Sequence, residues 1–449
     1  MFVDFLLEVF KERRDAEAII WKEQVYSYDW LLNQFAYWQR RIALEKLPSG
    51  AVVILEADFS PQAVALFLAL ADHGCMLVPL TESVKAKRAT FINIAEGEIA
   101  ITIDSDDVAL IESLNRTARH PLYEQLRGEH HPGLVLFSSG STGESKAAAH
   151  DLLWLLDKFK TPRRSQRTIT FLLYDHIGGV NTMLHTLSNG GCLVTVRERG
   201  PDEVLAAIEK HRVELLPTSP TFINLVLLSE AYRRHDLSSL KTVTYGTEPM
   251  PESTLRRFNS LFPAINLQQT YGLSEVGILR SKSRSSDSLW VKLGGESFET
   301  RVVEGILHIK AKSAMLGYLN APSPFTADGW FNTNDMVEVD GDYLKILGRA
   351  SEIINVGGEK VYPAEVESVI RELEAVADVT VFGEKNPITG NIVCAHVLPA
   401  FELEDARRKE FIAQVKRHCR DNLQSYKVPV KVSIATGQQY GERFKKIRR

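Results

Sequence analysis

The sequence predicts an α/β protein with a large N-terminal domain of helix-covered sheets and a small C-terminal α+β domain. The chain has 449 residues, about three times a usual domain of roughly 150 residues, so two or three compact units are expected. Its content of 44% hydrophobic and 24% charged residues is ordinary for a globular protein. From residue 50 onward, short β-branched runs alternate with helical periods, which is typical of parallel sheets covered by helices.

This alternation orders the expected elements. The first unit has a strand at 51–55, a helix at 61–73 and a strand at 76–80. Later strands are expected at 192–196, 215–218 and 242–246. The first is followed by a helix at 202–211, the second by a helix that runs through residue 230, and the third by a helix at 251–262.

The pattern changes near residue 345 and predicts a domain boundary. Short strands at 343–347 and 352–356 lead into a helix at 364–373, with further strands near 379–382 and 392–396. We therefore expect an N-terminal domain at 1–347, a hinge at 348–351 and a C-terminal domain at 352–449.

Composition excludes several classes of function. The net charge of -4 gives no overall positive field, so a nucleic-acid partner is not expected. The four cysteines lack CxxC spacing and are too few for a disulfide framework, which favours a cytoplasmic location. The start of the chain predicts an amphipathic helix rather than a signal peptide, and the longest charge-free apolar stretch, 59–71, is too short to span a membrane.

A loop of small hydroxylated residues and glycines follows the apolar run at 134–137. Glycines let backbone N–H groups face an anion, hydroxyls add donors, and a lysine supplies the countercharge, so the loop predicts a phosphate site. Ser145 and Ala147 do not fit the Walker pattern, which disfavours P-loop NTPases. The residues of this phosphate loop are Ser138, Ser139, Gly140, Ser141, Thr142, Gly143 and Lys146.

Four further motifs follow the loop in order, at 268–275, 329–335, 348–365 and 445–449. Together they resemble the adenylate-forming superfamily of acyl-CoA synthetases, aryl-CoA ligases, luciferases and peptide-synthetase adenylation domains, and most closely a short acyl- or aryl-CoA ligase. The resemblance runs from about Trp21 to the last residue. It implies that ATP and a carboxylic acid form an acyl-adenylate with release of pyrophosphate, and that a thiol then captures the acyl group.

The resemblance also implies roles for single residues. The phosphate loop would hold the β- and γ-phosphates, Glu275 would bind Mg²⁺, and Ser274 would touch the α-phosphate. Tyr271 would stack on adenine within the motif that includes Thr270 and Gly272, and Asp335 and Arg349 would bind the ribose. Lys446 would bridge the substrate carboxylate and the α-phosphate.

The C-terminal domain is expected to be mobile, swinging about a hinge at Ser351 between the two half-reactions. Gly358 would then line the approach of the thiol. The sequence departs from the family pattern at Asn334, Ser351 and Lys445. Asn tolerates a left-handed backbone, so the turn before Asp335 is expected to survive.

The acid is expected to lie near His176, in a segment resembling the family's region beside the reacting carboxylate. Gly178 and Gly179 are expected to leave space in this pocket, which suits an uncharged fatty or aromatic tail. Asp175 keeps open an amino-acid substrate, because relatives that activate amino acids place an Asp there.

Coenzyme A is the simplest acceptor for the acyl group. One alternative is the phosphopantetheine of an acyl or peptidyl carrier protein, which the basic C-terminal tail would also suit. Another is a non-catalytic nucleotide-binding or assembly protein.

Overall fold

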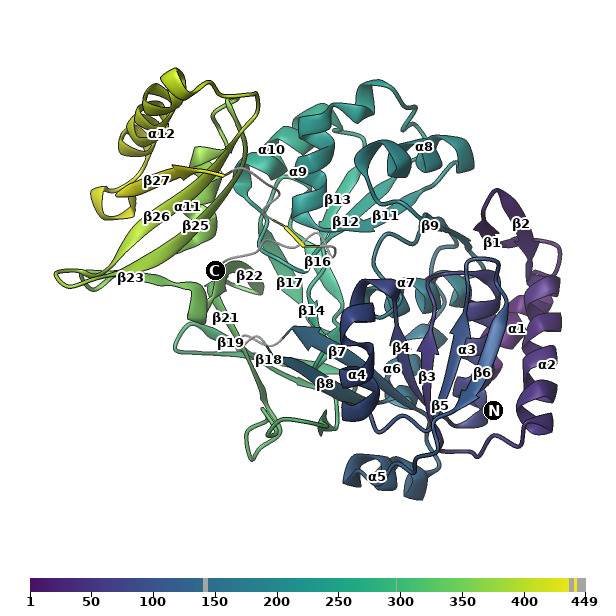
Figure 1. Ribbon diagram of the computed structural model, residues 1–449. Helices are drawn as coiled ribbons and strands as arrows, with labels where there is room; N and C mark the ends of the chain where they lie inside the picture. Colours follow the sequence, from purple (N-terminus) through teal and green to yellow (C-terminus); the bar gives the residue numbers. More distant parts are fainter. Residues whose placement is uncertain (140–143, 296, 436–439, 442–449) are drawn as a thin grey trace.

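Residues 1–139, 144–295, 297–435 and 440–441 are described by the computed structural model (Figure 1). A first seven-stranded sheet has the order β20-β8-β7-β4-β3-β5-β6. Its four central strands are parallel, and the edge strands β6, β8 and β20 run antiparallel to their neighbours. Its strands are β3 (Val52–Glu56), β4 (Met76–Leu80), β5 (Ile99–Ile103), β6 (Ala109–Ser113), β7 (Gly133–Ser139), β8 (Ser145–Asp151) and β20 (Gly317–Tyr318).

A second seven-stranded sheet has the order β13-β12-β11-β9-β10-β1-β2. All of its pairings are parallel except the hairpin of β1 with β2. The strands are β1 (Glu17–Trp21), β2 (Gln24–Ser27), β9 (Arg167–Ile169), β10 (Cys192–Val194), β11 (Leu215–Thr218), β12 (Thr242–Tyr245) and β13 (Asn266–Gln269).

Helices cover both sheets, as the alternating pattern predicts. They are α1 (Asp4–Glu12), α2 (Tyr28–Leu44), α3 (Pro61–His73), α4 (Arg88–Ile94), α5 (Pro121–Glu129), α6 (Leu152–Asp157), α7 (Ile177–Ser188), α8 (Pro201–His211), α9 (Pro220–Ser229) and α10 (Glu252–Leu261).

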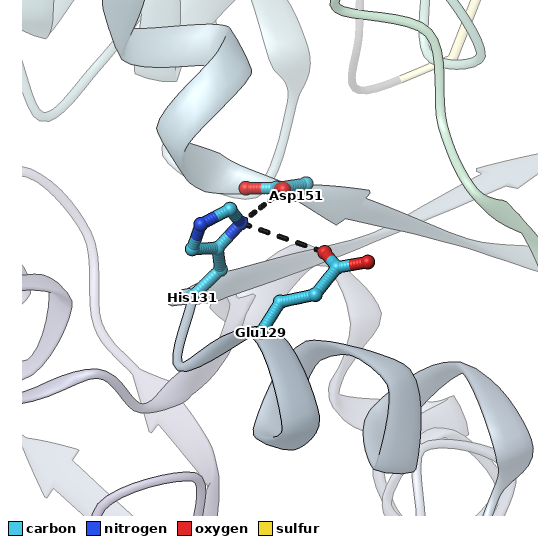
Figure 2. Close-up of side chains that lie close together, drawn as sticks. All are labelled: Glu129, His131 and Asp151. Atoms are coloured by element: carbon cyan, nitrogen blue, oxygen red, sulfur yellow. Dashed lines mark hydrogen bonds and ion pairs between the residues drawn. The ribbon is translucent and has the colours of Figure 1, made fainter.

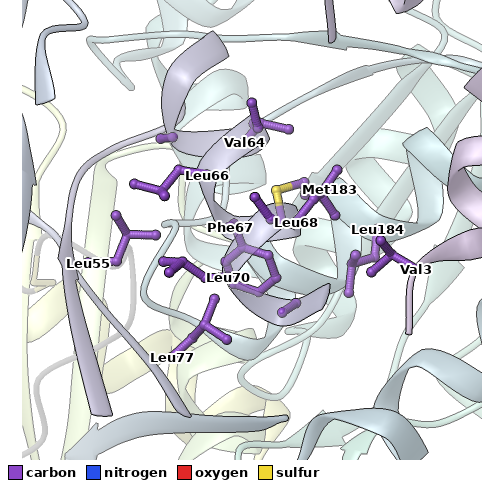
Figure 3. Close-up of a cluster of buried hydrophobic side chains, with 14 of the residues drawn as sticks. Val3, Leu55, Val64, Leu66, Phe67, Leu68, Leu70, Leu77, Met183 and Leu184 are labelled. Atoms are coloured by element: carbon purple, nitrogen blue, oxygen red, sulfur yellow. The ribbon is translucent and has the colours of Figure 1, made fainter. Parts of the chain in front are cut away.

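Helix α3 lies at the centre of the largest apolar core. Every residue from Ala63 to Ala71 is buried, which is the pattern of a helix packed on all sides. Figure 3 shows its side chains between Leu55 and Leu77 of the first sheet and Met183 and Leu184 of α7. The helix begins at a Ser60 cap, whose hydroxyl accepts from the Ala63 N–H at 3.2 Å, and ends at Gly74 with a φ of 86°.

A third, antiparallel sheet was not predicted from the sequence. It has the order β16-β17-β22-β21-β19-β18, and a two-stranded hairpin of β14 and β15 lies beside it in the chain. Much of β18 and the end of β21 is exposed, so these strands lack the continuous apolar runs that mark buried parallel strands. The strands are β14 (Gly272–Leu273), β15 (Gly277–Ile278), β16 (Ser281–Ser283), β17 (Trp290–Leu293), β18 (Phe298–Val303), β19 (Ile306–Ala311), β21 (Phe331–Asp340) and β22 (Tyr343–Arg349).

The C-terminal region forms its own sheet and core. Strands β23 (Ile354–Val356), β24 (Glu359–Val361), β25 (Val376–Asn386), β26 (Gly390–Pro399) and β27 (Lys431–Ile434) pack with helices α11 (Pro363–Ile370) and α12 (Arg408–Asn422). The predicted α/β class with a large N-terminal and a smaller C-terminal domain is thus confirmed. The predicted hinge overlaps a 3₁₀ turn at Ala350–Glu352, between β22 and β23. The exact domain limits remain a prediction.

Hydrogen bonds between described residues join the C-terminal unit to helices α9 and α10. Asn224 Nδ2 of α9 donates to the Ala377 carbonyl at 3.3 Å, and the Ser253 N–H of α10 donates to Ser368 Oγ of α11 at 3.1 Å. Within the described chain, no helix is long and apolar enough to cross a membrane. All four cysteines are buried and free.

Candidate active site

Three side chains meet beside the predicted phosphate loop. The Tyr318 hydroxyl of β20 donates to Glu275 Oε1 at 2.7 Å. The Lys146 ammonium lies 5.2 Å from the centre of the Tyr318 ring. Tyr318 therefore places the predicted phosphate-binding lysine and the predicted magnesium ligand at one position. Sequence reasoning missed Tyr318, because it lies on a two-residue strand with no motif around it.

The loop itself connects two antiparallel strands. Ser138 pairs with Lys146 and Ser139 with Ser145, so the chain turns back from β7 into β8. The described chain continues from the loop into strand β8 rather than into a helix, in agreement with the exclusion of a Walker motif. Gly140, Ser141, Thr142 and Gly143 lie outside the described residues.

A second group forms at the start of the antiparallel sheet. The Tyr271 hydroxyl donates to Asp335 Oδ2 at 2.6 Å, and Arg349 Nε lies 3.5 Å from Asp335 Oδ1. Asp335 and Arg349 face each other across β21 and β22. Asp335 is 7% exposed, whereas the Arg349 side chain is exposed. Asn334 has a φ of 59°, which confirms that the residue in place of glycine keeps a left-handed turn.

The two groups are electrostatically coupled into one site. Burial raises the pKa of Asp335, the Arg349 guanidinium opposes this shift, and the Glu275 carboxylate adds to it. Burial also raises the pKa of Tyr318, with Glu275 adding to the shift and Arg349 opposing it. Tyr318, Glu275, Asp335 and Arg349 are therefore near enough to influence one another. The resulting polar site lies between the first parallel sheet and the antiparallel sheet.

A buried histidine, His150, hydrogen-bonds to the backbone of the segment that presents Glu275. His150 Nε2 lies 2.6 Å from the Ser274 carbonyl oxygen, so it donates a hydrogen bond there. Burial lowers the pKa of His150 to about 4, although the carbonyl bond opposes the shift. The Glu275 carbonyl in turn accepts from the Met315 N–H at 2.7 Å. Ser274 and Glu275 are thus fixed through their backbone, which leaves the Ser274 hydroxyl and the second oxygen of the Glu275 carboxylate for a ligand.

Replacing His150 with Gln is expected to reduce the loss of stability in acid. The pKa of His150 is about 4 in the folded chain and 6.5 ordinarily, so the unfolded state binds more protons between these values. Lowering the pH from 7.5 to 5 should therefore cost the native protein about 2 kcal/mol from this group alone. Urea midpoints at the two pH values measure the effect. His130→Asn, at an exposed helix end, is the control. An unchanged difference in His150→Gln would contradict this assignment.

The predicted acid region lies at the start of α7. His176 is the N-cap of this helix, and its Nδ1 accepts from the Gly178 N–H at 3.0 Å. This bond places the ring proton on Nε2 when the imidazole is neutral. Asp175 is buried, and its Oδ2 accepts from the Thr81 hydroxyl at 3.0 Å.

The expectation that Gly179 opens space in the pocket is wrong. A Cβ at Gly179 would lie 1.9 Å from the Leu173 carbonyl oxygen, and one at Gly178 would lie 2.6 Å from a Leu172 methyl. Gly179 thus lets α7 approach the 172–173 backbone closely, and its role is packing of the helix start rather than pocket volume. Gly178 lies against the Leu172 side chain and the His176 ring.

The end of β12 shows further signs of a ligand site. Thr247 is a β-branched residue with a φ of 75°, which is a strained conformation. The buried hydroxyls of Tyr245 and Thr247 have no hydrogen-bond partner among the described residues. Unpaired buried hydroxyls and local strain both concentrate at binding sites. Thr270 lies against this turn, because its hydroxyl donates to the Tyr245 carbonyl at 3.1 Å.

The other predicted residues differ in their surroundings. Gly358 is exposed, has a φ of 96°, and an added Cβ there would touch nothing within 4 Å. Ser351 is also exposed, and its Oγ accepts from Asn334 Nδ2 at 3.2 Å. Gly272 pairs with Ile278 inside the hairpin that presents Glu275. Lys445 and Lys446 lie outside the described residues.

A separate cluster of possible metal ligands lies near the opposite end of β8 (Figure 2). His131 Nδ1 lies 2.7 Å from Asp151 Oδ2 and 3.6 Å from a Glu129 carboxylate oxygen. Asp151 also caps α6, because its Oδ1 accepts from the Leu153 N–H at 2.9 Å. Both carboxylates thus face the same imidazole nitrogen, an arrangement that ties the start of β7 to α6 through a hydrogen bond.

Comparison with known proteins decides the family. The model of the AMP-binding enzyme family matches residues 6–319, and that of the AMP-binding enzyme C-terminal domain matches residues 365–439. The chain belongs to the AMP-binding enzyme family. The resemblance inferred from the motifs is therefore confirmed. The two matched ranges include Lys146, Glu275 and Tyr318 of the polar site and most of the C-terminal unit, whereas Asp335 and Arg349 lie between them.

Two curated relatives of this AMP-binding enzyme are CoA-thioester-forming enzymes by name. The Indoleacetate–CoA ligase of Aromatoleum aromaticum is 28% identical over 61% of this chain and 58% of its own length. The Feruloyl-CoA synthase of an Amycolatopsis species is 30% identical over 67% of this chain and 65% of its own length. The chain thus spans about three-fifths of these relatives.

The fold is also that of a solved structure. The anthranilate CoA ligase AuaEII, in complex with anthranoyl-AMP, superposes with a TM-score of 0.84. The match covers 99% of this chain and 95% of the other, at 19% identity. At this identity the similarity establishes the shared architecture of both units.

Proposed function

We propose that this protein is an AMP-forming acid–thiol ligase. It activates a carboxylic acid with ATP as an acyl-adenylate, releases pyrophosphate, and transfers the acyl group to a thiol, most simply that of coenzyme A. The observation that carries the proposal is the coupled pair of residue groups, Lys146–Tyr318–Glu275 and Tyr271–Asp335–Arg349. The first group has the charges needed for a phosphate chain with its metal. The second has the acceptor and donor needed for a ribose.

Glu275 fits the proposed Mg²⁺. One of its oxygens accepts the Tyr318 hydroxyl, and the other, Oε2, makes no hydrogen bond within the described part of the chain. A carboxylate oxygen left open in a partly buried site is the ligand that Mg²⁺ prefers. When bound, the ion would neutralise phosphate charge. Tyr318 holds the carboxylate in one orientation, and Lys146 supplies a second positive charge.

The remaining residues complete the proposal. Ser274 lies beside Glu275 with its backbone fixed by His150, which leaves its hydroxyl for the α-phosphate. Lys446, outside the described residues, is proposed to offset the charge where the carboxylate meets the α-phosphate. His176 is proposed to lie beside that carboxylate through Nε2. A cytoplasmic location, suggested by the free cysteines, belongs to the same proposal.

The acceptor requires a second arrangement of the C-terminal unit. Gly358 lies in an exposed turn, and an added Cβ there would meet nothing within 4 Å, so this arrangement gives no sign of a narrow thiol channel at Gly358. Rotation about the turn at 350–352 would be needed for Gly358 to line a thiol's approach. A carrier-protein phosphopantetheine would need the same rotation, and it remains the alternative acceptor.

Pyrophosphate exchange tests the first half-reaction. The purified protein is incubated with ATP, Mg²⁺, labelled pyrophosphate and a panel of fatty, aromatic, dicarboxylic and amino acids. Exchange that depends on one class of acid supports the proposal, and tight ATP binding without exchange across the panel refutes it. The best acid is then offered with coenzyme A or with a phosphopantetheinylated carrier protein. Mass spectrometry shows which thioester forms.

A further inference from the structure

A group of basic side chains lies next to the Glu275 hairpin. The Lys158 ammonium donates to Asn181 Oδ1 of α7 at 2.5 Å and to the Ile278 carbonyl of β15 at 3.0 Å. These two bonds use two of the three N–H donors of the ammonium. Lys158 is therefore held between α7 and β15, with one donor left.

Three more basic residues are linked to this lysine through electrostatic interactions or through the elements that it contacts. Arg163 acts electrostatically on Lys158, and both act on His185, which lies one helical turn beyond Asn181. Arg280, two residues after Ile278, acts on Arg163. Lys158 and His185 are partly buried, and Arg163 and Arg280 are exposed. We call these four residues the basic cluster.

Among the described residues, none of the four basic side chains forms an ion pair with a carboxylate. Burial, followed by Arg163, lowers the pKa of Lys158 to about 7. Burial, followed by Arg163 and Lys158, lowers the pKa of His185 to about 4. Every charged group that acts on Lys158, Arg163 or His185 is itself basic. Grouping like charges with no counterion is unfavourable, so the arrangement suits an anion supplied from outside the chain.

The basic cluster and the proposed acid site share helix α7. Asn181 and His185 follow His176 on α7 by five and nine residues, which is about 8 to 14 Å along a helix axis. From the other side, Ile278 shares a short hairpin with Glu275. A substrate whose reacting carboxylate lies near His176 would thus direct its far end along α7 toward Lys158.

We propose that the acid activated by this enzyme carries a second anionic group, a distal carboxylate, that is bound by the basic cluster. This inference rests on the proposed adenylating function and narrows its substrate class. It also replaces the uncharged tail expected from the sequence. Lys158 would donate its third N–H to the distal carboxylate, and Arg163, His185 and Arg280 would supply the surrounding positive field. An anion there would also favour the protonated form of Lys158.

Matched acids test this substrate class. Pyrophosphate exchange is measured with straight-chain dicarboxylates from hexanedioate to dodecanedioate and with the corresponding monocarboxylates. Phenylacetate, phenylpropanoate and their 4-carboxy derivatives form an aromatic series. We expect at least one dicarboxylate to exceed its monocarboxylate partner tenfold or more in kcat/KM. The gain should lie mainly in KM, because the distal carboxylate does not react.

Variants then test which residues cause the preference for a dicarboxylate over its monocarboxylate. Lys158→Met is expected to lower the dicarboxylate preference, which is the ratio of the two kcat/KM values, tenfold or more. Arg163→Gln and Arg280→Gln, at exposed positions that tolerate substitution, should each lower it severalfold. Arg164→Gln is the matched control, because Arg164 acts on Glu214 instead of on the cluster.

The outcomes separate the two proposals. If monocarboxylates support exchange and no dicarboxylate improves on them, the distal-carboxylate site is refuted while adenylation stands. A dicarboxylate preference that survives in all three cluster variants also refutes the site. If no acid of either series or of the wider panel supports exchange, adenylation itself fails and the inference falls with it.

Discussion

Glu275→Gln is expected to lower acid-dependent pyrophosphate exchange by about 10²- to 10³-fold at saturating ATP and acid. The amide keeps the shape of the side chain and can still accept the Tyr318 hydroxyl through its oxygen. The variant therefore removes the negative charge without removing the contact that fixes the side chain. Its loss of activity should reflect the loss of an anionic ligand for Mg²⁺.

Two further variants separate charge from position. Tyr318→Phe leaves the Glu275 carboxylate charged but frees its orientation, and we expect a smaller loss, of about tenfold. Glu299→Gln makes the same chemical change as Glu275→Gln at an exposed position of β18 and should have no effect. The Mg²⁺ concentration giving half-maximal exchange is measured for each. If this Mg²⁺ concentration is the same in Glu275→Gln as in the wild type, Glu275 is not the metal ligand.

The parallel sheets could be predicted because their signals are local. Helix α3 follows a Ser60–Pro61 start and precedes Gly74, and both flanking strands are apolar except for Glu56 at the end of β3. Helix bounds at α8 and α10 agree with expectation to about a residue for the same reason. Caps, turns and periodicity are properties of neighbouring residues, so a single sequence contains them.

The antiparallel sheet and the contacts within the site depend on pairing between distant residues. Tyr318 bonds to Glu275 across 43 residues, and Tyr271 to Asp335 across 64 residues. The sequence motifs predicted Glu275, Tyr271 and Asp335 as site residues. They did not indicate Tyr318 or the hydrogen bond from His150 to the Ser274 carbonyl. The basic cluster also assembles from three separate segments, around 158–163, 185 and 280. Nothing near any one of them in the sequence predicts an anion site.

The predictions made for Asn334 and for Gly179 had opposite outcomes. Asn334 replaces the glycine usual in the family, yet its φ of 59° keeps the turn that presents Asp335. This departure therefore gives no support to a non-catalytic protein. Gly179, in contrast, looked like an opening in the pocket and is a close contact with the Leu173 backbone. A glycine's role depends on what its missing Cβ would touch, which only the folded chain reveals.

Asp335→Asn is expected to raise the KM for ATP about 10²-fold with a smaller change in kcat. The carboxylate is buried, accepts from Tyr271 at 2.6 Å and faces Arg349 at 3.5 Å. The amide would lose the charge that pairs with Arg349 and one of the two strong acceptors proposed for the ribose hydroxyls. Hydrogen bonds to charged groups contribute about 1.5 to 3 kcal/mol each, which corresponds to a factor of about 10 to 100.

The same substitution on the same strand provides the control. Asp340 lies in β21 with Asp335 but is exposed and paired with Arg284 at 2.6 Å, so Asp340→Asn should leave the KM for ATP unchanged. Calorimetric titration with AMP gives a second readout that needs no acid substrate. If Asp335→Asn binds AMP as tightly as the wild type, the ribose is held elsewhere. The Tyr271–Asp335–Arg349 group would then serve only to join β21 and β22, because a purely structural aspartate would alter the melting temperature without altering nucleotide affinity.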